Sequence, residues 1–224
     1  MNASIITYLI FPVLHVLGPV LIWFGAVMLI PYGVSLYKAD GADFVFAQSA
    51  AATITIGLLL TIAFWKFKRE MTAQHGFLVV TLSWTAIAAA ATLPIMLYLP
   101  QYSFIEAFFE TMSCLTTTGA TMMTDIDGLP ISINGWRCLL AWIGGMGLIV
   151  FSVAILPLLG VGGAQIMKAE MSGPLKETRL TPRIAETARA LYLIYFGLSV
   201  VSAIAYHLAG MEWDDAVMHM MTTV

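Results

Sequence analysis

Residues 104–121 read FIEAFFETMSCLTTTGAT, and this stretch decides the predicted fold. Residues 104–115 form an apolar helical segment, which would be about 18 Å long at about 1.5 Å per residue. Such a helix reaches roughly halfway through a hydrocarbon core of about 30 Å. The next six residues, 116–121, hold four threonines and one glycine. Non-helical backbone at membrane depth is tolerated only where it lines a cavity or is buried in protein. The sequence therefore predicts a half-helix followed by a return strip, the name used below for residues 116–121.

The composition excludes an ordinary soluble globular protein. Only 10% of the residues are charged and the mean hydropathy is +0.89, whereas charged residues make up about a quarter of a typical soluble domain. Stretches such as 77–99 and 138–161 are apolar on every face and long enough to cross a bilayer, which takes roughly 20 helical residues. Barrel strands would instead alternate in polarity. We expect an all-α, polytopic membrane protein.

The hydropathy pattern predicts five membrane spans, at residues 5–30, 44–65, 77–99, 136–161 and 188–209. No Lys or Arg precedes the first span, so we interpret it as a retained anchor and not as a secretory signal. Trp65, Trp136 and Trp213 lie at span ends, and we expect them in the headgroup zone, which amphipathic rings prefer.

The charges predict an orientation in the membrane. Eight of the ten Lys and Arg residues lie in or beside the second and fourth connections between spans. The positive-inside rule makes that side cytoplasmic and places the N-terminus there. Nine of the thirteen Asp and Glu residues then lie outside, where they would attract cations. Alternatively, the acids only fill positions that the positive-inside rule leaves open.

The sequence contains an internal repeat with an offset of 109 residues. The shift places Trp213 over Phe104, Asp215 over Glu106, Ala216 over Ala107, Met221 over Met112 and Thr222 over Ser113. The preceding spans, 77–99 and 188–209, also correspond. In this register Val224 lies over Leu115. We therefore expect the chain to be a fragment of a longer repeat protein, one residue short of a second return strip.

The return strip has two possible roles. Threonines favour extended backbone that aligns successive carbonyls, and Gly119 permits dihedrals closed to other residues. The half-helix directs the partial negative charge of its carboxyl end toward the strip. Together these features predict a site at which carbonyl oxygens replace the water shell of a cation. The alternative is that the threonines and glycine only cap the helix and hydrogen-bond its carbonyls.

Three segments carry a family resemblance: EAFFETMSCLTTTGAT (106–121), WRCLLAWIGGMGLIVFSVAILPLLGVGG (136–163) and LTPRIAETARALY (180–192). From about residue 30 onward the chain resembles the Trk/Ktr/HKT superfamily of potassium transporters, and within it the bacterial TrkH-type subunits. The resemblance implies repeats of helix, pore helix, filter and helix, as in potassium channels. The implied organisation is a two-helix preamble in 1–70, a first pore repeat in 71–163, a cytoplasmic loop in 164–187, and a truncated second repeat in 188–224 with a partial pore helix in 213–224.

The resemblance also implies a function, which is potassium uptake across the bacterial inner membrane. In this family main-chain oxygens bind the ion, which carries over to Thr116, Thr117, Thr118 and Gly119, with K⁺ held chiefly at Thr117 and Thr118. Glycine at position 119 goes with potassium preference in related transporters. Ala120, Thr121 and Glu110 are expected to support the filter.

The expected partners follow from the same resemblance: a second copy in a homodimer, a cytoplasmic nucleotide-binding regulatory subunit of the TrkA type, and the lipid bilayer. We expect K⁺ as the transported ion, with no nucleic acid, no organic cofactor and no catalytic residue. Symport and passive conduction both remain open.

Several polar or small residues allow a structural and a functional interpretation. Glu110 could tune the field at the filter or hold the strip by hydrogen bonds, and we favour the second because an acid in the membrane needs a partner. Gly144, Gly145 and Gly147 favour close helix packing over a hinge. His15 and His207 favour packing over a proton relay.

Cys114 and Cys138 lie in apolar segments and are expected as buried free thiols. The rival function is a membrane-embedded enzyme or the anchor subunit of a membrane complex. Against it, no His/Glu or Ser/His pair lies at a usable helical spacing within one span.

Overall fold

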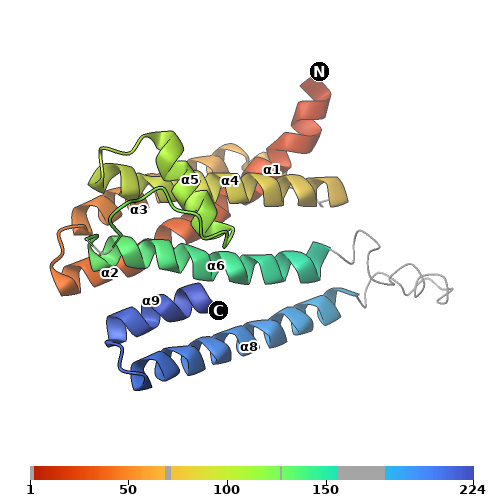
Figure 1. Ribbon diagram of the computed structural model, residues 1–224. Coiled ribbons are helices and arrows are strands. Elements are labelled where there is room, and N and C mark those ends of the chain that lie inside the picture. Colours follow the sequence, from red (N-terminus) through yellow and green to blue (C-terminus); the bar gives the residue numbers. More distant parts are fainter. Residues whose placement is uncertain (1–2, 69–71, 127, 156–179) are drawn as a thin grey trace. The chain divides into compact units, whose positions relative to one another are not determined.

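The computed structural model describes residues 3–68, 72–126, 128–155 and 180–224, and within these ranges it contains helices and no strand (Figure 1). The elements are α1 (Ala3–Val27), α2 (Leu29–Lys38), α3 (Asp43–Ala63), the short 3-10 helix η1 (Trp65–Phe67), α4 (Ala73–Tyr98), α5 (Phe104–Leu115), α6 (Ile131–Ile155), α8 (Leu180–Leu208) and α9 (Trp213–Thr223). The predicted all-α class is confirmed.

Four stretches of the described chain are long and apolar enough to cross a membrane: Tyr8–Lys38, Asp43–Ala63, Gln74–Tyr98 and Glu186–Leu208. The first is longer than the predicted span 5–30, because α2 follows α1 after a single intervening residue, Met28. Of the predicted span 136–161, residues 156–161 lie outside the described residues, as do residues 164–179 of the predicted loop. The rest of that loop, from Leu180, is the beginning of α8.

The helices α1 and α3 cross at two glycines. A Cβ atom on Gly18 would lie 2.7 Å from the carbonyl oxygen of Gly57, and a Cβ on Gly57 would lie 2.7 Å from the carbonyl oxygen of Gly18. Both distances are too short for a real contact, so the backbones touch directly. Small residues of this kind let membrane helices approach closely.

Trp136, near the start of α6, is fully buried. Its ring centroid lies 5.5 Å from that of Phe24 and 6.1 Å from that of Phe46, and its indole nitrogen donates to the carbonyl oxygen of Ala91 at 3.2 Å. The expectation that Trp136 is a headgroup anchor was therefore wrong. The indole N–H of Trp136 donates to a backbone carbonyl oxygen of α4 and therefore needs no partner among water or lipid headgroups. Trp65 and Trp213 are exposed, and their place in the headgroup zone stays a prediction.

The chain forms two compact units, residues 1–140 and 141–224. The first holds α1 to α5 and the beginning of α6. The second holds the rest of α6 with α8 and α9. Within the second unit Gly145 approaches α8 closely, because a Cβ at this position would lie 2.9 Å from the hydroxyl oxygen of Tyr195. That hydroxyl donates to the carbonyl oxygen of Trp142 at 3.0 Å. For Gly145, the packing interpretation is supported.

Candidate ion site

The helix α5 covers the same residues as the predicted half-helix, 104–115, and its start is fixed by a capping box. The Ser103 amide donates to Glu106 Oε2 at 2.8 Å, and the Glu106 amide donates to Ser103 Oγ at 3.4 Å. Reciprocal bonds of this kind satisfy amides that a helix start leaves without partners. Further along, the Thr111 hydroxyl donates to the carbonyl oxygen of Ala88 in α4 at 2.9 Å. The half-helix is therefore fixed at its beginning and along one side.

The helix ends in a Schellman motif built from threonines. The Thr118 amide donates to the carbonyl oxygen of Ser113 at 2.9 Å, and the Thr117 amide donates to that of Cys114 at 3.0 Å. This pattern requires a left-handed residue, usually glycine, just past the helix. Here the residue is Thr117, with φ of 55°. The expectation of extended backbone was wrong at this position, because pairing the last helix carbonyls outweighs the extended preference of a β-branched residue.

The second half of the return strip runs back along α5 and is hydrogen-bonded to it. Glu110, whose side chain is 1% exposed, accepts from the Thr121 hydroxyl at 3.0 Å and from the Met122 amide at 3.0 Å. The Ser113 hydroxyl donates to the carbonyl oxygen of Ala120 at 2.6 Å. Of the two interpretations of Glu110, these contacts support the one in which it holds the strip in place.

Arg137 of α6 completes this network, and the sequence reasoning missed its role. Its guanidinium donates to Glu110 Oε1 from Nε at 2.8 Å and also from Nη2, and its Nη1 donates to Asn134 Oδ1 at 3.0 Å. The side chain of Arg137 is only 12% exposed. A signal was available, because a single charge near the start of an apolar span calls for a named partner. Nothing in the spacing indicated which acid it would be.

The carbonyl oxygens of residues 116–119 take no part in these hydrogen bonds. All four residues are exposed, and within the described chain no hydrogen bond is made to any of these carbonyl oxygens. The Thr116 hydroxyl is directed back to the helix, donating to the carbonyl oxygen of Met112 at 2.8 Å. Gly119 has φ of 75°, as its predicted conformational role requires. The capping alternative is therefore correct for the backbone of residues 116–118, and it leaves the carbonyl oxygens of 116–119 unpaired.

Other candidate groups of the sequence pack against neighbouring side chains, and the Nδ1 atom of His15 is buried without a hydrogen-bond partner in the described chain. No group of three or more His, Cys, Asp or Glu side chains that could hold a metal ion occurs in the described part of the chain. Cys114 and Cys138 are free thiols, half-buried and buried respectively. The His207 ring stacks on Trp213 with centroids 4.0 Å apart, and the His15 ring lies edge-on to Trp65.

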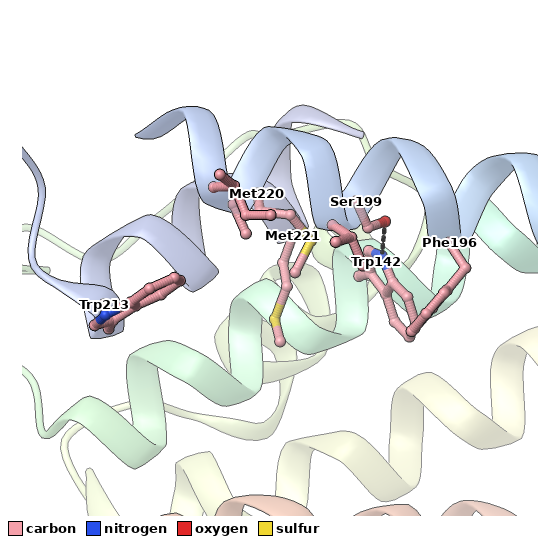
Figure 2. A pocket seen from close by; sticks show the side chains of 9 residues that line it. Trp142, Phe196, Ser199, Trp213, Met220 and Met221 are labelled. Carbon is pink, nitrogen blue, oxygen red and sulfur yellow. Dashed lines mark hydrogen bonds between the residues drawn. The ribbon is translucent and has the colours of Figure 1, made fainter. Parts of the chain in front are cut away.

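The second unit contains an apolar pocket of about 270 Å³ between α6, α8 and α9. Figure 2 shows Trp142, Phe196 and Met221 among the side chains around it. The Ser199 hydroxyl at this pocket is already engaged, because it accepts from the Trp142 indole nitrogen at 3.0 Å and donates to the Tyr195 carbonyl oxygen at 2.8 Å. The lining is thus suited to apolar contacts and offers a cation no cluster of oxygen ligands.

Comparison with known proteins identifies the family of the chain. Residues 42–224 match the family model TrkH, described as a cation transport protein. The chain belongs to the TrkH family. Among curated TrkH-family proteins, the Trk system potassium uptake protein TrkH of Vibrio parahaemolyticus is 43% identical over 213 residues, covering 95% of this chain and 44% of that protein. The protein of the same name from Escherichia coli K12 is 45% identical over 211 residues, covering 94% of this chain and 44% of its own length.

A solved TrkH structure has the same fold. The crystal structure of the potassium transporter TrkH from Vibrio parahaemolyticus matches with a TM-score of 0.80 and 39% identity, covering 94% of this chain and 42% of that chain. The present chain thus spans about 44% of the length of the curated TrkH relatives that it matches.

Proposed function

We propose that this chain supplies one wall of a potassium uptake pathway, in which K⁺ is held by the backbone carbonyl oxygens of residues 116–119, chiefly Thr117 and Thr118. The relatives that the chain resembles are named potassium uptake proteins. The proposal includes no catalytic step and no organic cofactor. A complete filter needs further walls, and these would come from other repeats of the same kind.

The observation that carries the proposal is the group of four consecutive carbonyl oxygens, at residues 116–119, that accept no hydrogen bond within the described chain and lie at the end of a half-helix. Carbonyl oxygens can replace the hydration shell of K⁺. The carboxyl end of α5 adds partial negative charge at the same place, and no basic residue lies in its last turn to cancel it. The amides of Thr117 and Thr118 bond to the helix end, and Ser113 and Glu110 hold Ala120 and Met122, so the segment that carries these carbonyl oxygens is anchored on both sides.

The organisation we propose follows the family resemblance: a preamble in 1–70, a first pore repeat in 71–163, a cytoplasmic loop in 164–187 and the beginning of a second repeat in 188–224. The protein would lie in the bacterial inner membrane with its N-terminus in the cytoplasm. Its proposed partners are a second copy of the subunit and a cytoplasmic regulatory subunit that binds nucleotides.

The test uses a chimera in which residues 1–224 replace the matching segment of the Escherichia coli relative. The chimera is expressed in cells that lack their own potassium uptake systems, and rubidium and sodium uptake are compared. Gly119→Ser should lower the rubidium-to-sodium ratio by about tenfold, which equals about 1.4 kcal/mol. The reason is that φ of 75° is disfavoured for any residue with a side chain, so the strip relaxes and its carbonyl oxygens move.

Gly135→Ser is the matched control. Gly135 lies in α6. At both glycines an added Cβ would have no atom within 4 Å, but only Gly119 of the two has a positive φ. This variant should keep the ratio of the parent chimera. An unchanged ratio in Gly119→Ser, at equal protein level, would show that the strip does not select the ion.

A further inference from the structure

The turn between α2 and α3 presents a carboxylate to a distant helix. Asp40 Oδ2 accepts from the Ser132 amide at 2.9 Å, across 92 residues of sequence. Asp40 Oδ1 accepts from the Ser35 hydroxyl and from the Ala42 amide, the latter at 3.3 Å. Ser35, Ala42 and Ser132 are all buried. Asp40 itself is half-buried, and its carboxylate accepts from donors in three segments of the first unit.

The backbone on both sides of Asp40 is unusual. Ala39 has φ of 53° and Gly41 has φ of 81°. Left-handed backbone costs a residue with a side chain about 1–2 kcal/mol, so Ala39 keeps this conformation only because the surroundings require it. The two dihedrals turn the chain sharply on either side of Asp40, whose carboxylate accepts both from Ser35 of α2 and from Ser132 of the distant helix α6.

Ser132 is the second residue of α6, where amides have no partner within the helix. A carboxylate accepting from such an amide acts as an N-cap and also complements the positive end of the helix dipole. Burial alone would raise the pKa of Asp40, but hydrogen bonds from Ser35 and Ser132 outweigh it, and the pKa is lowered from its ordinary value of 3.8. Asp40 is thus ionised at neutral pH, as a cap of this kind requires.

The capped helix carries the residue that holds the return strip. Arg137 follows Ser132 by five residues, or about 7.5 Å along the helix axis. Its guanidinium binds Glu110, and Glu110 binds Thr121 and the Met122 amide. All of these residues lie within the first unit, 1–140. Because a helix is stiff, fixing its first turn fixes where Arg137 meets Glu110.

We propose that Asp40 is a positioning residue for the return strip: it caps α6 from the α2–α3 turn and so sets the place of the Arg137–Glu110 pair. This rests on the proposed function only where ion selectivity is concerned. The structural part, a coupling between Asp40 and the strip, holds whether or not the strip binds potassium.

The structural part is tested by hydrogen exchange on the full 224-residue chain in lipid nanodiscs. Asp40→Asn keeps the size of the side chain but removes its charge and one acceptor. Amide exchange should become about fivefold faster both in the first turn of α6 and at residues 120–123 of the strip region. Asp43→Asn, which removes the same charge three residues away, should leave both segments unchanged. Faster exchange confined to α6, or an equal effect of Asp43→Asn, would overturn the proposal.

A milder variant covers the case in which Asp40→Asn does not fold. Ser35→Ala removes one donor to the carboxylate and leaves the Ser132 bond in place, so the same two segments should respond with a smaller increase. A response in neither segment would overturn the coupling.

The functional part uses the chimera described above. Asp40→Asn should lower the rubidium-to-sodium uptake ratio by about threefold while Asp43→Asn keeps it, because a displaced strip discriminates less between cations. If the exchange results hold and the ratio stays constant in both Asp40→Asn and Gly119→Ser, the proposed function fails and the coupling stands. If only Gly119→Ser changes the ratio, Asp40 does not position the ion site.

Discussion

The hairpins α4–α5 and α8–α9 have the same outline and different polar contacts. Each is a long helix followed by a short one, with Ala107 and Ala216 buried at matching positions. Where α5 has the buried Glu110 bound to Arg137, α9 has the exposed His219, whose Nδ1 lies 2.9 Å from the carbonyl oxygen of Asp215. Both hairpins thus bury a small apolar residue at the matching position. The buried Glu110–Arg137 pair belongs to the first, whereas in the second the hydroxyl oxygens of Tyr206 and Thr223 lie 2.8 Å apart.

The largest expected effect concerns the buried ion pair between Glu110 of the first hairpin and Arg137. Arg137→Met should lower the free energy of unfolding by about 3–5 kcal/mol, because it leaves Glu110 buried without its partner. His219→Gln should change it by less than about 0.5 kcal/mol, as exposed substitutions usually do. Denaturant titrations of the chain in detergent micelles measure both.

The double variant Glu110→Gln, Arg137→Met is the control for this prediction. Removing both charges should recover part of the lost stability, because no unpaired buried charge remains. A single-variant loss below about 1 kcal/mol would mean that water reaches the pair and that the two hairpins differ less than their contacts indicate.

An intermediate effect tests what the hairpins share. Ala107→Leu and Ala216→Leu should each cost about 1–3 kcal/mol, because both positions are fully buried and have no room for three more carbons. Ala51→Leu and Ala205→Leu, at exposed helix positions, are the matched controls and should cost little. The same titrations apply. A large loss of unfolding free energy at only one of the two buried alanines would show that the two hairpins do not pack in the same way.

The smallest effect concerns the helix starts. Ser103→Ala should cost about 1 kcal/mol, because it removes the hydroxyl of a capping box. Glu212, at the matching position before α9, makes no side-chain cap bond, so Glu212→Ala should cost only a few tenths of a kcal/mol. Hydrogen-exchange rates of the first-turn amides of α5 and α9 measure each effect locally. Equal changes in the two helices would contradict the prediction that only α5 depends on a side-chain cap.

Local patterns in the sequence predicted the short helices well. The expected ranges 104–115 and 213–224 correspond to Phe104–Leu115 and Trp213–Thr223. The threonine- and glycine-rich strip marks the end of the first helix, and the 109-residue offset transfers its start to the second. The element α2 was missed. Its sequence LIPYGVSLYK mixes apolar residues with Pro, Gly, Ser and Lys, so a hydropathy criterion ends the span before it. Likewise, α8 begins at Leu180 and not at 188, since its first turns are polar.

Contacts between distant residues could not be predicted in the same way. The sequence indicated that Glu110 needs a partner, but Arg137 lies 27 residues away and Asp40 lies 92 residues from Ser132. No helical periodicity relates such positions. The left-handed conformation of Thr117 could not be predicted either, because threonine has no intrinsic tendency toward it and only the helix end imposes it.

The contact between Gly18 and Gly57 bears on the order in which the protein assembles. Both glycines lie in helices that precede α4, α5 and α6 along the chain, and the crossing needs no side chain from those later helices. Because chains are synthesised from the N-terminus, we expect α1 and α3 to pair while the rest is still being made. Cysteines introduced at Gly25 and Ile54, adjacent across this crossing, should cross-link in ribosome-arrested chains that stop before α6 is complete. Assembly would then begin at the Gly18–Gly57 crossing, before the proposed ion site is complete.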